Sequence, residues 1–257
     1  MKTYEAVILG SGFFSFAYAL SHENVLILER NQLADRTFGA CLRGFARSRK
    51  PLFSPAAREL EGFFRQHGIL TDDRVDVPNL ELGLCAFLPP KEKPDILLDT
   101  LCTSVKKQDD GLWQITAVNN EGICRFSAKT LIDTQIPTGN CLNVLVKAPN
   151  GMPPLPENPD FCVTALPAFR ENEVLLSFRF ASLSEINRAK TLLVPYLEAI
   201  PKEEGICILA SSCRMFADKP LLPYRTADGI FRIDESAFGD CLDAFEKGGG
   251  TLDSLMA

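Results

Sequence analysis

The strongest chemical signal in the sequence is a glycine-rich turn close to its start. Gly10 and Gly12 directly follow an apolar segment, and Glu29 comes nineteen residues after Gly10. Gly10 allows a strand to turn tightly into a helix, and Gly12 has no side chain to keep a diphosphate away from the backbone. Glu29 can accept hydrogen bonds from ribose hydroxyls, and its charge disfavours a 2′-phosphate. The spacing therefore predicts a dinucleotide site that is unsuited to NADP.

Three elements have to position this turn. Residues 4–9 and 25–28 are continuous apolar runs that predict buried strands, while residues 13–22 contain no helix breaker and predict the helix between them. Two strands connected through a helix form a βαβ unit with parallel strands. The N-terminus of that helix offers unpaired N–H groups and a partial positive charge to the phosphates. An ordinary βα turn with an exposed glutamate is the alternative interpretation.

The residues around the two glycines complete the predicted phosphate site. Ser11 lies between the glycines, and we expect the backbone N–H groups of Phe13 and Phe14 to reach the phosphates while their rings face the core. Ser15 stands where a third glycine is usual in this pattern. We expect this serine to loosen the packing of the helix against the strand slightly.

Composition narrows the other classes of function. The chain has 257 residues, a net charge of −6 and 46% hydrophobic residues, which is typical of a globular protein. The negative charge argues against a general nucleic-acid surface. The basic stretch from Arg43 to Lys50 is either a solvated face or an anion site. With only His22 and His67 present, we expect no metal site and no Ser-His-Asp triad.

The sequence also indicates the environment of the protein. No window approaches eighteen consecutive apolar residues, and the start lacks the pattern of a signal peptide. We therefore expect no membrane contact, a cytoplasmic location and reduced cysteines. Cys41 is either a buried structural residue or a redox thiol activated by a neighbouring base or helix end. Arg214 is either a surface residue or a ligand for a substrate carboxylate.

Apolar periodicity and turn residues predict the remaining elements. Helices are expected at residues 55–68, where Ser54 and Pro55 begin the helix, and at 94–103, 184–199 and 241–247. Strands are expected at residues 80–88, 104–107, 112–118, 123–126, 130–134, 161–166, 174–180, 206–210 and 229–233. This pattern predicts an α/β fold with a Rossmann-like parallel central sheet and a β-meander, plus a small β-rich α+β region.

Proline and glycine become frequent between Pro137 and Pro159, which indicates a crossing into this second region. We expect a discontinuous nucleotide-binding domain made of residues 1–140 and 225–257. Residues 141–224 would then form a small substrate or cap domain, to which residues 41–100 also contribute in an alternative division.

On these features the chain resembles the FAD-dependent oxidoreductases of the glutathione-reductase-like superfamily, as a short member with a single FAD domain. The turn together with Glu29 and Arg30 carries this resemblance most specifically. The resemblance implies that a loop containing Arg36 and Gly39 covers the pyrophosphate, although the usual double glycine is missing. It also implies that the backbone around Val105 pairs with the adenine.

Two later segments extend the resemblance. Asp133 and Thr134 resemble a turn that lies beside the cofactor, although Gln135 departs from the Ala-Thr-Gly pattern of the family. Gly239 and Asp240 are similar to the late Gly-Asp motif, in which the aspartate holds the ribityl chain. The helix that follows would direct its N-terminus at the flavin, where it stabilises negative charge. Asp240 is at the same time a candidate for a simple N-cap.

Three functions are left open by these residues. The first is a flavoenzyme that transfers a hydride or electrons to or from a small organic substrate or a redox partner protein. The second is a degenerate flavin-fold protein without catalysis, which the departures at Ser15 and Gln135 favour. The third is an NAD-binding Rossmann protein, against which the Gly-Asp segment argues. For contacts with reacting atoms, the sequence offers only Cys41 and Arg214.

Overall fold

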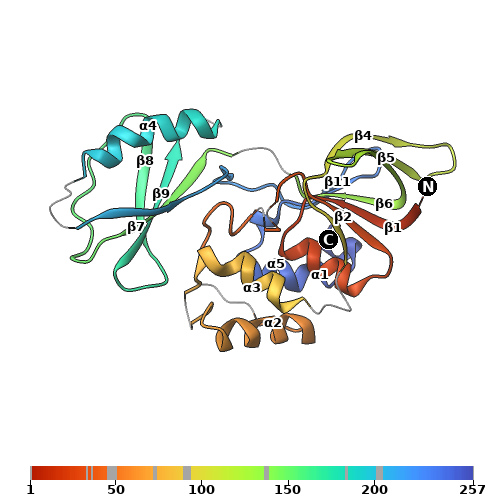
Figure 1. Cartoon of the computed structure of the whole chain (residues 1–257), viewed down its shortest axis with the longest axis horizontal. Coiled ribbons are helices and arrows are strands. Elements are labelled where there is room, and N and C mark those ends of the chain that lie inside the picture. Colours follow the sequence, from red (N-terminus) through yellow and green to blue (C-terminus); the bar gives the residue numbers. More distant parts are fainter. Residues whose placement is uncertain are drawn as a thin grey trace.

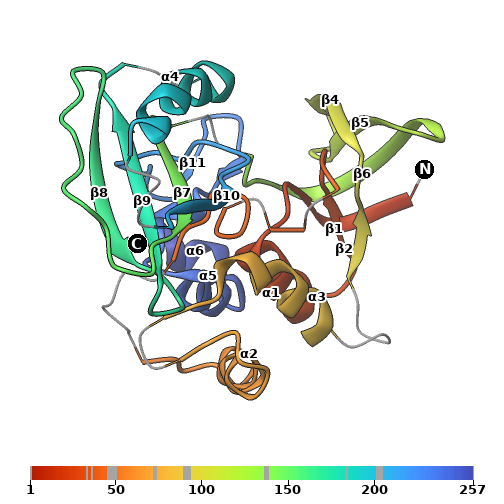
Figure 2. The same cartoon turned by 60° about the vertical axis from the view of Figure 1, so that its left-hand side comes forward.

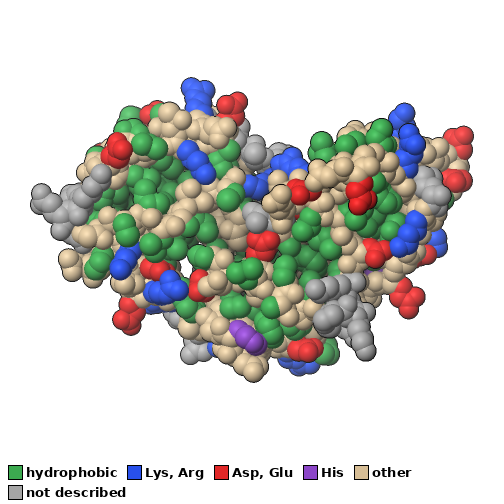
Figure 3. Space-filling view, in the orientation of Figure 1, with side chains coloured by type: hydrophobic (Ala, Val, Ile, Leu, Met, Phe, Trp, Pro, Cys, Tyr) green, Lys and Arg blue, Asp and Glu red, His purple; other side chains and the backbone are tan. Residues whose placement is uncertain are grey.

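The computed structural model describes residues 2–32, 34–35, 37–44, 51–71, 74–88, 94–135, 139–182, 185–200 and 205–256. Arg36 and most of the basic stretch before Lys50 lie outside the described residues. The described chain forms two lobes, one around a mixed sheet and one around an antiparallel sheet (Figure 1). Positively and negatively charged side chains are interspersed over the face seen in Figure 3.

The larger sheet has a parallel centre. Its strands are β1 (Lys2–Leu9), β2 (Val25–Leu28), β3 (Asp95–Leu97), β4 (Leu101–Lys107), β5 (Trp113–Asn119), β6 (Gly122–Asp133), β11 (Tyr224–Arg225) and β12 (Phe231–Arg232). β1 pairs in parallel with β2 on one side and with β6 on the other, and β12 continues the parallel order beyond β6. β4, β5 and the first half of β6 form the antiparallel meander. The predicted α/β fold and its βαβ unit are confirmed.

Alternation along β1 sends its side chains into two different cores. Ala6 and Ile8 face a helical layer, while Val7 and Leu9 face Trp113 and its neighbours in the meander. The helical layer contains α1 (Phe13–Ser21), α2 (Pro55–Gln66), α3 (Leu80–Phe87) and α5 (Cys241–Gly248). The short helix α6 (Leu252–Leu255) follows α5. The parallel strands are thus covered on both faces, as parallel sheets require.

The sequence explains the start of α2 in atomic terms. The hydroxyl of Ser54 accepts the N–H of Ala57, and Pro55 occupies the first turn, as predicted. Leu60 and Phe64 lie on the face that meets the core. Gly68, just beyond the helix, has a φ of +67°, a conformation that favours glycine.

The second lobe is a sheet with one covered and one open face. The sheet order is β10 (Cys207–Ser211), β7 (Cys141–Lys147), β9 (Glu173–Phe180) and β8 (Phe161–Pro167), with every pairing antiparallel. Helix α4 (Ile186–Glu198) packs on one face, as Figures 1 and 2 show. Asn143 and Leu145 of β7 line a pocket on the opposite face.

Three hydrogen bonds join the second lobe to the segment after Gly39. Cys213 N–H donates to Ala40 O at 2.8 Å, and the hydroxyl of Ser212 donates to Cys41 O at 2.9 Å. The side-chain amide of Asn143 donates to Leu42 O at 3.0 Å. The three successive carbonyl groups of residues 40–42 therefore accept hydrogen bonds from the second lobe, one from β7 and two from the chain directly after β10.

Two predicted elements are wrong. Residues 80–88 form helix α3 rather than a strand, because Leu80 and Leu84 lie on one helical face, and a short apolar run does not distinguish the two structures. Residues 94–103 form β3 and the start of β4 rather than a helix, because backbone pairing with Leu26–Leu28 outweighs local preference. The strand β7 lies inside the proline-rich stretch that was expected to be a crossing.

Two further boundaries differ from the expectation. The separate strands expected at 123–126 and 130–134 are one continuous strand, β6. Helix α4 begins at Ile186, and Ser184, its expected first residue, lies outside the described residues. The strands expected at 161–166, 174–180 and 206–210 and the helix at 241–247 are confirmed within two residues at each end. The helices of the described segments are too short or too polar to cross a membrane.

The crossing of α1 and α5 depends on a glycine. A Cβ built on Gly248 would collide with Phe14 O and lie 2.9 Å from the Cβ of Ala17. We expect Gly248→Ala to lower the free energy of unfolding by about 1–3 kcal/mol, since overpacking a rigid contact has this cost. Gly62→Ala in α2 is the control, because nothing lies within 4 Å of its Cβ position and alanine should stabilise the helix by up to about 1 kcal/mol. Urea unfolding measures both, and equal stability of the two variants would contradict this packing.

Candidate functional site

The candidate site is built around the turn between β1 and α1. Gly10 has a φ of +100°, and its N–H donates to Leu28 O at 2.8 Å, so the turn starts at the ends of both parallel strands. A Cβ on Gly10 would lie 2.5 Å from the hydroxyl oxygen of Thr134. Both the backbone conformation and the close approach of the end of β6 therefore require glycine at this position.

Ser15, in place of the third glycine, closes the turn instead of loosening it. Its hydroxyl lies 3.0 Å from Gly10 O and 3.3 Å from Oε1 of Glu235, and the residue is fully buried. The expectation of looser packing is therefore not supported by the contacts of Ser15. The rings of Phe13 and Phe14 are fully buried in the core, as expected.

Glu29 lies at the end of β2 and faces the turn. Its Oε2 accepts the backbone N–H of Ser11 at 2.9 Å and the hydroxyl of Ser11 at 3.1 Å. Its Oε1 accepts the backbone and side-chain N–H groups of Asn31, each at 2.9 Å. The side chain of Glu29 is fully buried, and its hydrogen bonds connect Ser11 of the turn with Asn31, while the neighbouring Arg30 is exposed.

A second carboxylate occupies the space over Gly12. Glu235 belongs to the short 3₁₀ helix η3 (Glu235–Ala237) that follows β12. A Cβ on Gly12 would lie 2.5 Å from Oε1 of Glu235 and closer still to Oε2. The backbone N–H groups of Phe14 and Ser15 hydrogen-bond the carboxyl group. The position that the sequence assigns to a diphosphate is therefore filled by an anionic group of the chain itself.

Burial dominates the electrostatics of Glu235. Burial, and to a smaller extent the nearby Asp35, raise the pKa of this carboxyl from 4.5 to about 8, although the N–H groups of Ser15 and Phe14 act in the opposite direction. The pKa of Asp35 rises to about 6 for the same principal reason, burial. Two coupled acids thus lie at the N-terminus of α1, and each is harder to ionise than in water.

The loop that was expected to cover the pyrophosphate is organised around Asp35. Its carboxylate accepts the N–H groups of Thr37 and Phe38 at 3.1 Å and of Gly39 at 2.6 Å. Gly39 therefore directs its N–H at Asp35. Arg36, the other predicted contact in this loop, lies outside the described residues.

The glycine turn of Gly10 and Gly12, the carboxyl group of Glu235 over it and the end of β6 together form one site, which we call the corner. Thr134 donates its hydroxyl to Leu9 O at 3.1 Å, and Asp133 is paired with Arg232 of β12. The side chain of Gln135 lies beside Gly10, and its Nε2 is buried without a hydrogen-bond partner among the described residues. The structure therefore brings Gly10, Thr134 and Gln135 together, while a contact of this turn with a cofactor stays a prediction.

Val105 and the Gly239–Asp240 pair lie on other elements. Val105 is in β4 and packs at the edge of the meander core. Asp240 is the N-cap of α5, and its Oδ1 accepts the N–H of Asp243 at 2.8 Å. The N-cap interpretation is confirmed, and contacts of Val105, Gly239 and Asp240 with a cofactor stay a prediction.

The two candidates for contact with reacting atoms lie near each other. Cys41 is buried, and it lies within electrostatic reach of Arg43 and Arg214, whose pKa values burial lowers and Cys41 raises. Arg214 lies within electrostatic reach of Glu29 and Arg30, and burial lowers the pKa of its guanidinium group. Arg214 does not line the pocket of the second lobe.

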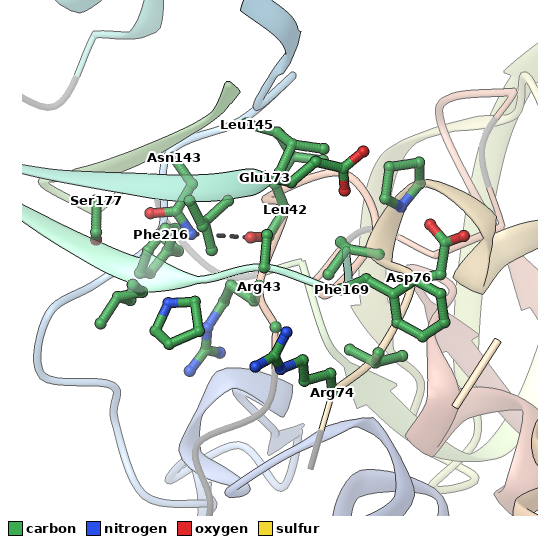
Figure 4. Close-up of a pocket in the computed structure, with 18 residues that line it drawn as sticks. Leu42, Arg43, Arg74, Asp76, Asn143, Leu145, Phe169, Glu173, Ser177 and Phe216 are labelled. Carbon is green, nitrogen blue, oxygen red and sulfur yellow. Dashed lines mark hydrogen bonds between the residues drawn. The ribbon is translucent and has the colours of Figure 1, made fainter. Parts of the chain in front are cut away.

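That pocket has a volume of about 430 Å³ and lies against the open face of the second sheet. Its walls are mostly apolar, with Leu145 and Leu175 from the sheet and Phe216 beside them. Figure 4 shows Arg43 and Arg74 on one side of the pocket and Asn143 on another. Oδ1 of Asn143 and one terminal nitrogen of Arg43 are buried without hydrogen-bond partners in the described chain. Such a lining suits an apolar molecule that carries a polar or anionic group.

Arg43 connects this pocket with the corner around Gly12. Its guanidinium group lies over the rings of Phe38 and Phe216 and donates to Ser236 O at 3.3 Å. Ser236 follows Glu235 directly in η3. Arg43 therefore lines the pocket and at the same time hydrogen-bonds the residue that follows Glu235.

Sequence reasoning missed Glu235 and Asp35, whereas Arg43 belongs to the basic stretch that was a candidate for an anion site. Asp234, Glu235 and Ser236 follow an apolar strand of the central sheet, and polar residues at such strand ends are typical of ligand sites in α/β proteins. The sequence therefore contains a signal for Glu235, although the later Gly239–Asp240 pair is the segment that resembles the family motif.

No family model and no curated protein matches the sequence. The fold, however, matches solved structures. The anhydrotetracycline hydroxylase OxyS from Streptomyces rimosus is similar over 97% of this chain and 62% of its own length, with a TM-score of 0.56 and 16% identity. The p-nitrophenol 4-monooxygenase PnpA from Pseudomonas putida DLL-E4 matches 94% of this chain and 73% of its own, with a TM-score of 0.55 and 12% identity.

A flavoprotein/dehydrogenase from Cytophaga hutchinsonii is also similar, over 96% of this chain and 76% of its own, with a TM-score of 0.51 and 13% identity. The chain therefore spans about three fifths to three quarters of these proteins. At this level of identity the likeness defines the fold. The chain has the α/β fold that these oxidoreductases share.

Proposed function

We propose that this chain is an FAD-dependent oxidoreductase that acts on a small, largely apolar organic molecule. The observation that carries the proposal is the position of Arg43, which lines the pocket of the second lobe and hydrogen-bonds Ser236, the residue next to the acid over Gly12. A flavin reaction requires substrate and cofactor side by side. The fold, which is similar to that of a hydroxylase, a monooxygenase and a flavoprotein/dehydrogenase, supports this class of reaction.

FAD fits the corner by three features of its residues. Gly12 leaves room that an acidic side chain fills, the N–H groups of α1 already bind a carboxyl group there, and the side-chain amide of Gln135 beside Gly10 has no hydrogen-bond partner among the described residues. Gly10, Gly12 and the start of α1 would hold the diphosphate, while Glu29 would accept the ribose hydroxyls. Bound FAD would supply the transfer of a hydride or electrons.

The protein's own residues would bind and orient the substrate. The apolar wall of the pocket excludes water from an aromatic or aliphatic body, and Arg43 offers an N–H that no described residue binds to an acidic or carbonyl oxygen. Residues 141–224 would form the substrate domain around this pocket. Cys41 and Arg214 stay candidates for direct contact with reacting atoms. Cys41 lies within electrostatic reach of Arg43, and Arg214 lies within electrostatic reach of Glu29.

Titration of the purified chain with FAD tests the cofactor assignment. We expect saturable binding of about one FAD per chain, followed by the absorbance and fluorescence of the flavin, and no comparable binding of NAD. Binding of NAD without FAD would favour the third function left open by the sequence. Photoreduction of the complex, followed by mixing with oxygen and candidate apolar acids or phenols, then tests turnover.

A second function is favoured by the carboxylate over Gly12. If Glu235 keeps its place permanently, the chain is a flavin-fold protein without cofactor and without redox activity. The absence of FAD binding at millimolar concentration in the same titration would support this alternative and contradict the first proposal.

A further inference from the structure

Glu235 is unusual among the acidic residues of the described chain. Its side chain is fully buried, and Oε2 has no hydrogen-bond partner within the described residues. An unpaired buried oxygen is costly, so its position calls for a compensating contact. The compensation visible here is the N-terminus of α1, with the N–H groups of Phe14 and Ser15 and the partial positive charge of the helix.

Groups from α1, from the loop after β2 and from the segment of Arg43 surround this carboxyl group. None of them is a cation that pairs with it among the described residues. α1 contributes the two N–H groups and the hydroxyl of Ser15. The loop after β2 contributes Asp35, a second acid. Arg43 lies on the other side of η3 and donates to Ser236 O rather than to Glu235. The corner therefore has an anion-binding helix end and an acidic side chain whose hydrogen bonding is incomplete within the described residues.

We propose that Glu235 is a built-in competitor for the phosphate position, which has to leave the N-terminus of α1 before any diphosphate can bind against Gly12. The steric argument is direct, because the carboxylate oxygens lie where even a single carbon on Gly12 would not fit. Above about pH 8, where Glu235 is ionised, the electrostatic argument points the same way, because two anions would then share one helix end with strong repulsion. The inference deepens the proposed function and rests on it only for the identity of FAD.

The experiment uses the full chain and inorganic pyrophosphate as the probe. Glu235→Ala removes the competitor, and Glu235→Gln keeps its bulk without its charge. Glu246→Ala is the matched control, because Glu246 also binds at the start of a helix, through Ser54 N at 2.9 Å and the hydroxyl of Ser54 at 2.7 Å, but away from this corner. The melting temperature of each protein is measured above pH 8, where Glu235 is ionised, with increasing pyrophosphate.

We expect pyrophosphate to raise the melting temperature of Glu235→Ala by several degrees, that of Glu235→Gln by less, and those of the wild type and Glu246→Ala hardly at all. An equal response in the wild type and both Glu235 variants would overturn the proposal, and so would no response in any of them. Should Glu235→Ala not fold, a response of Glu235→Gln no greater than that of the wild type would overturn it.

An FAD titration of the same proteins separates this inference from the proposed function. We expect Glu235→Ala to bind FAD at least tenfold more tightly than the wild type. If Glu235→Ala responds to pyrophosphate but neither protein binds FAD, the competitor role of Glu235 holds and the assignment of FAD fails. If the wild type and Glu235→Ala bind FAD with equal affinity, FAD is retained as cofactor and the competitor role fails.

Discussion

Replacing Gly12 with valine should abolish FAD binding and destabilise the protein at the same time. The valine side chain would occupy the space that Glu235 fills in the ligand-free chain and that the diphosphate needs in the complex. The backbone of Gly12 is extended, so valine is accommodated by the main chain and the effect comes from the side chain alone. We expect at least a hundredfold loss of FAD affinity and a loss of about 1–3 kcal/mol in the free energy of unfolding.

The measurement is a flavin titration combined with urea unfolding. Gly62→Val is the control, because this glycine lies on the exposed side of α2 with nothing near its Cβ position. Its FAD affinity should equal that of the wild type. Full FAD binding by Gly12→Val would show that the turn does not have the role assigned to it, whatever the effect on stability.

The second large effect concerns the pH dependence of stability. Because burial raises the pKa of Glu235 from 4.5 to about 8, the folded protein holds a proton between these pH values that the unfolded chain has lost. Stability contributed by this proton is complete below pH 4.5 and is lost as the pH rises through 8. The slope is about 1.4 kcal/mol per pH unit, which amounts to a total on the order of 5 kcal/mol.

Asp35 adds a loss of the same sign, but between pH 3.8 and about 6. The interval from pH 6 to 8 therefore isolates Glu235. We expect the free energy of unfolding of the wild type to fall across this interval by about 2 kcal/mol more than that of Glu235→Gln. Urea unfolding at pH 6, 7 and 8 gives the two slopes, with Glu246→Gln as a control for the removal of an acid elsewhere. Parallel slopes for the wild type and Glu235→Gln would contradict a buried, protonated Glu235.

The sequence was sufficient for the parallel centre of the fold because its signals are local. The apolar runs on either side of Gly10 form β1 and β2, and the hydroxyl of Ser54 and the ring of Pro55 begin α2 as expected. Residues 80–88 and 94–103 were predicted wrongly because their structure depends on partners distant in the chain. α3 packs on α2, and β3 pairs with β2.

The site was predictable to a similar extent. Gly10, Gly12 and Glu29 come together because the βαβ unit contains all three. The sequence could not reveal that Glu235 lies over Gly12, since the two residues are joined only by the pairing of β12 with β6 and of β6 with β1. In the same way, the hydroxyl of Ser15 compensates for the missing glycine through Gly10 O, a contact that no spacing rule anticipates.

The three hydrogen bonds that hold the carbonyls of Ala40, Cys41 and Leu42 have a mechanical consequence. They attach residues 40–42 to the second lobe along one line of hydrogen bonds, which we call the seam. The guanidinium group of the next residue, Arg43, reaches from the end of the seam to Ser236 of η3. A rotation of the second lobe would pull this seam along and shift Arg43 relative to Glu235. Opening of the pocket and opening of the phosphate position would then be a single concerted motion rather than two independent ones.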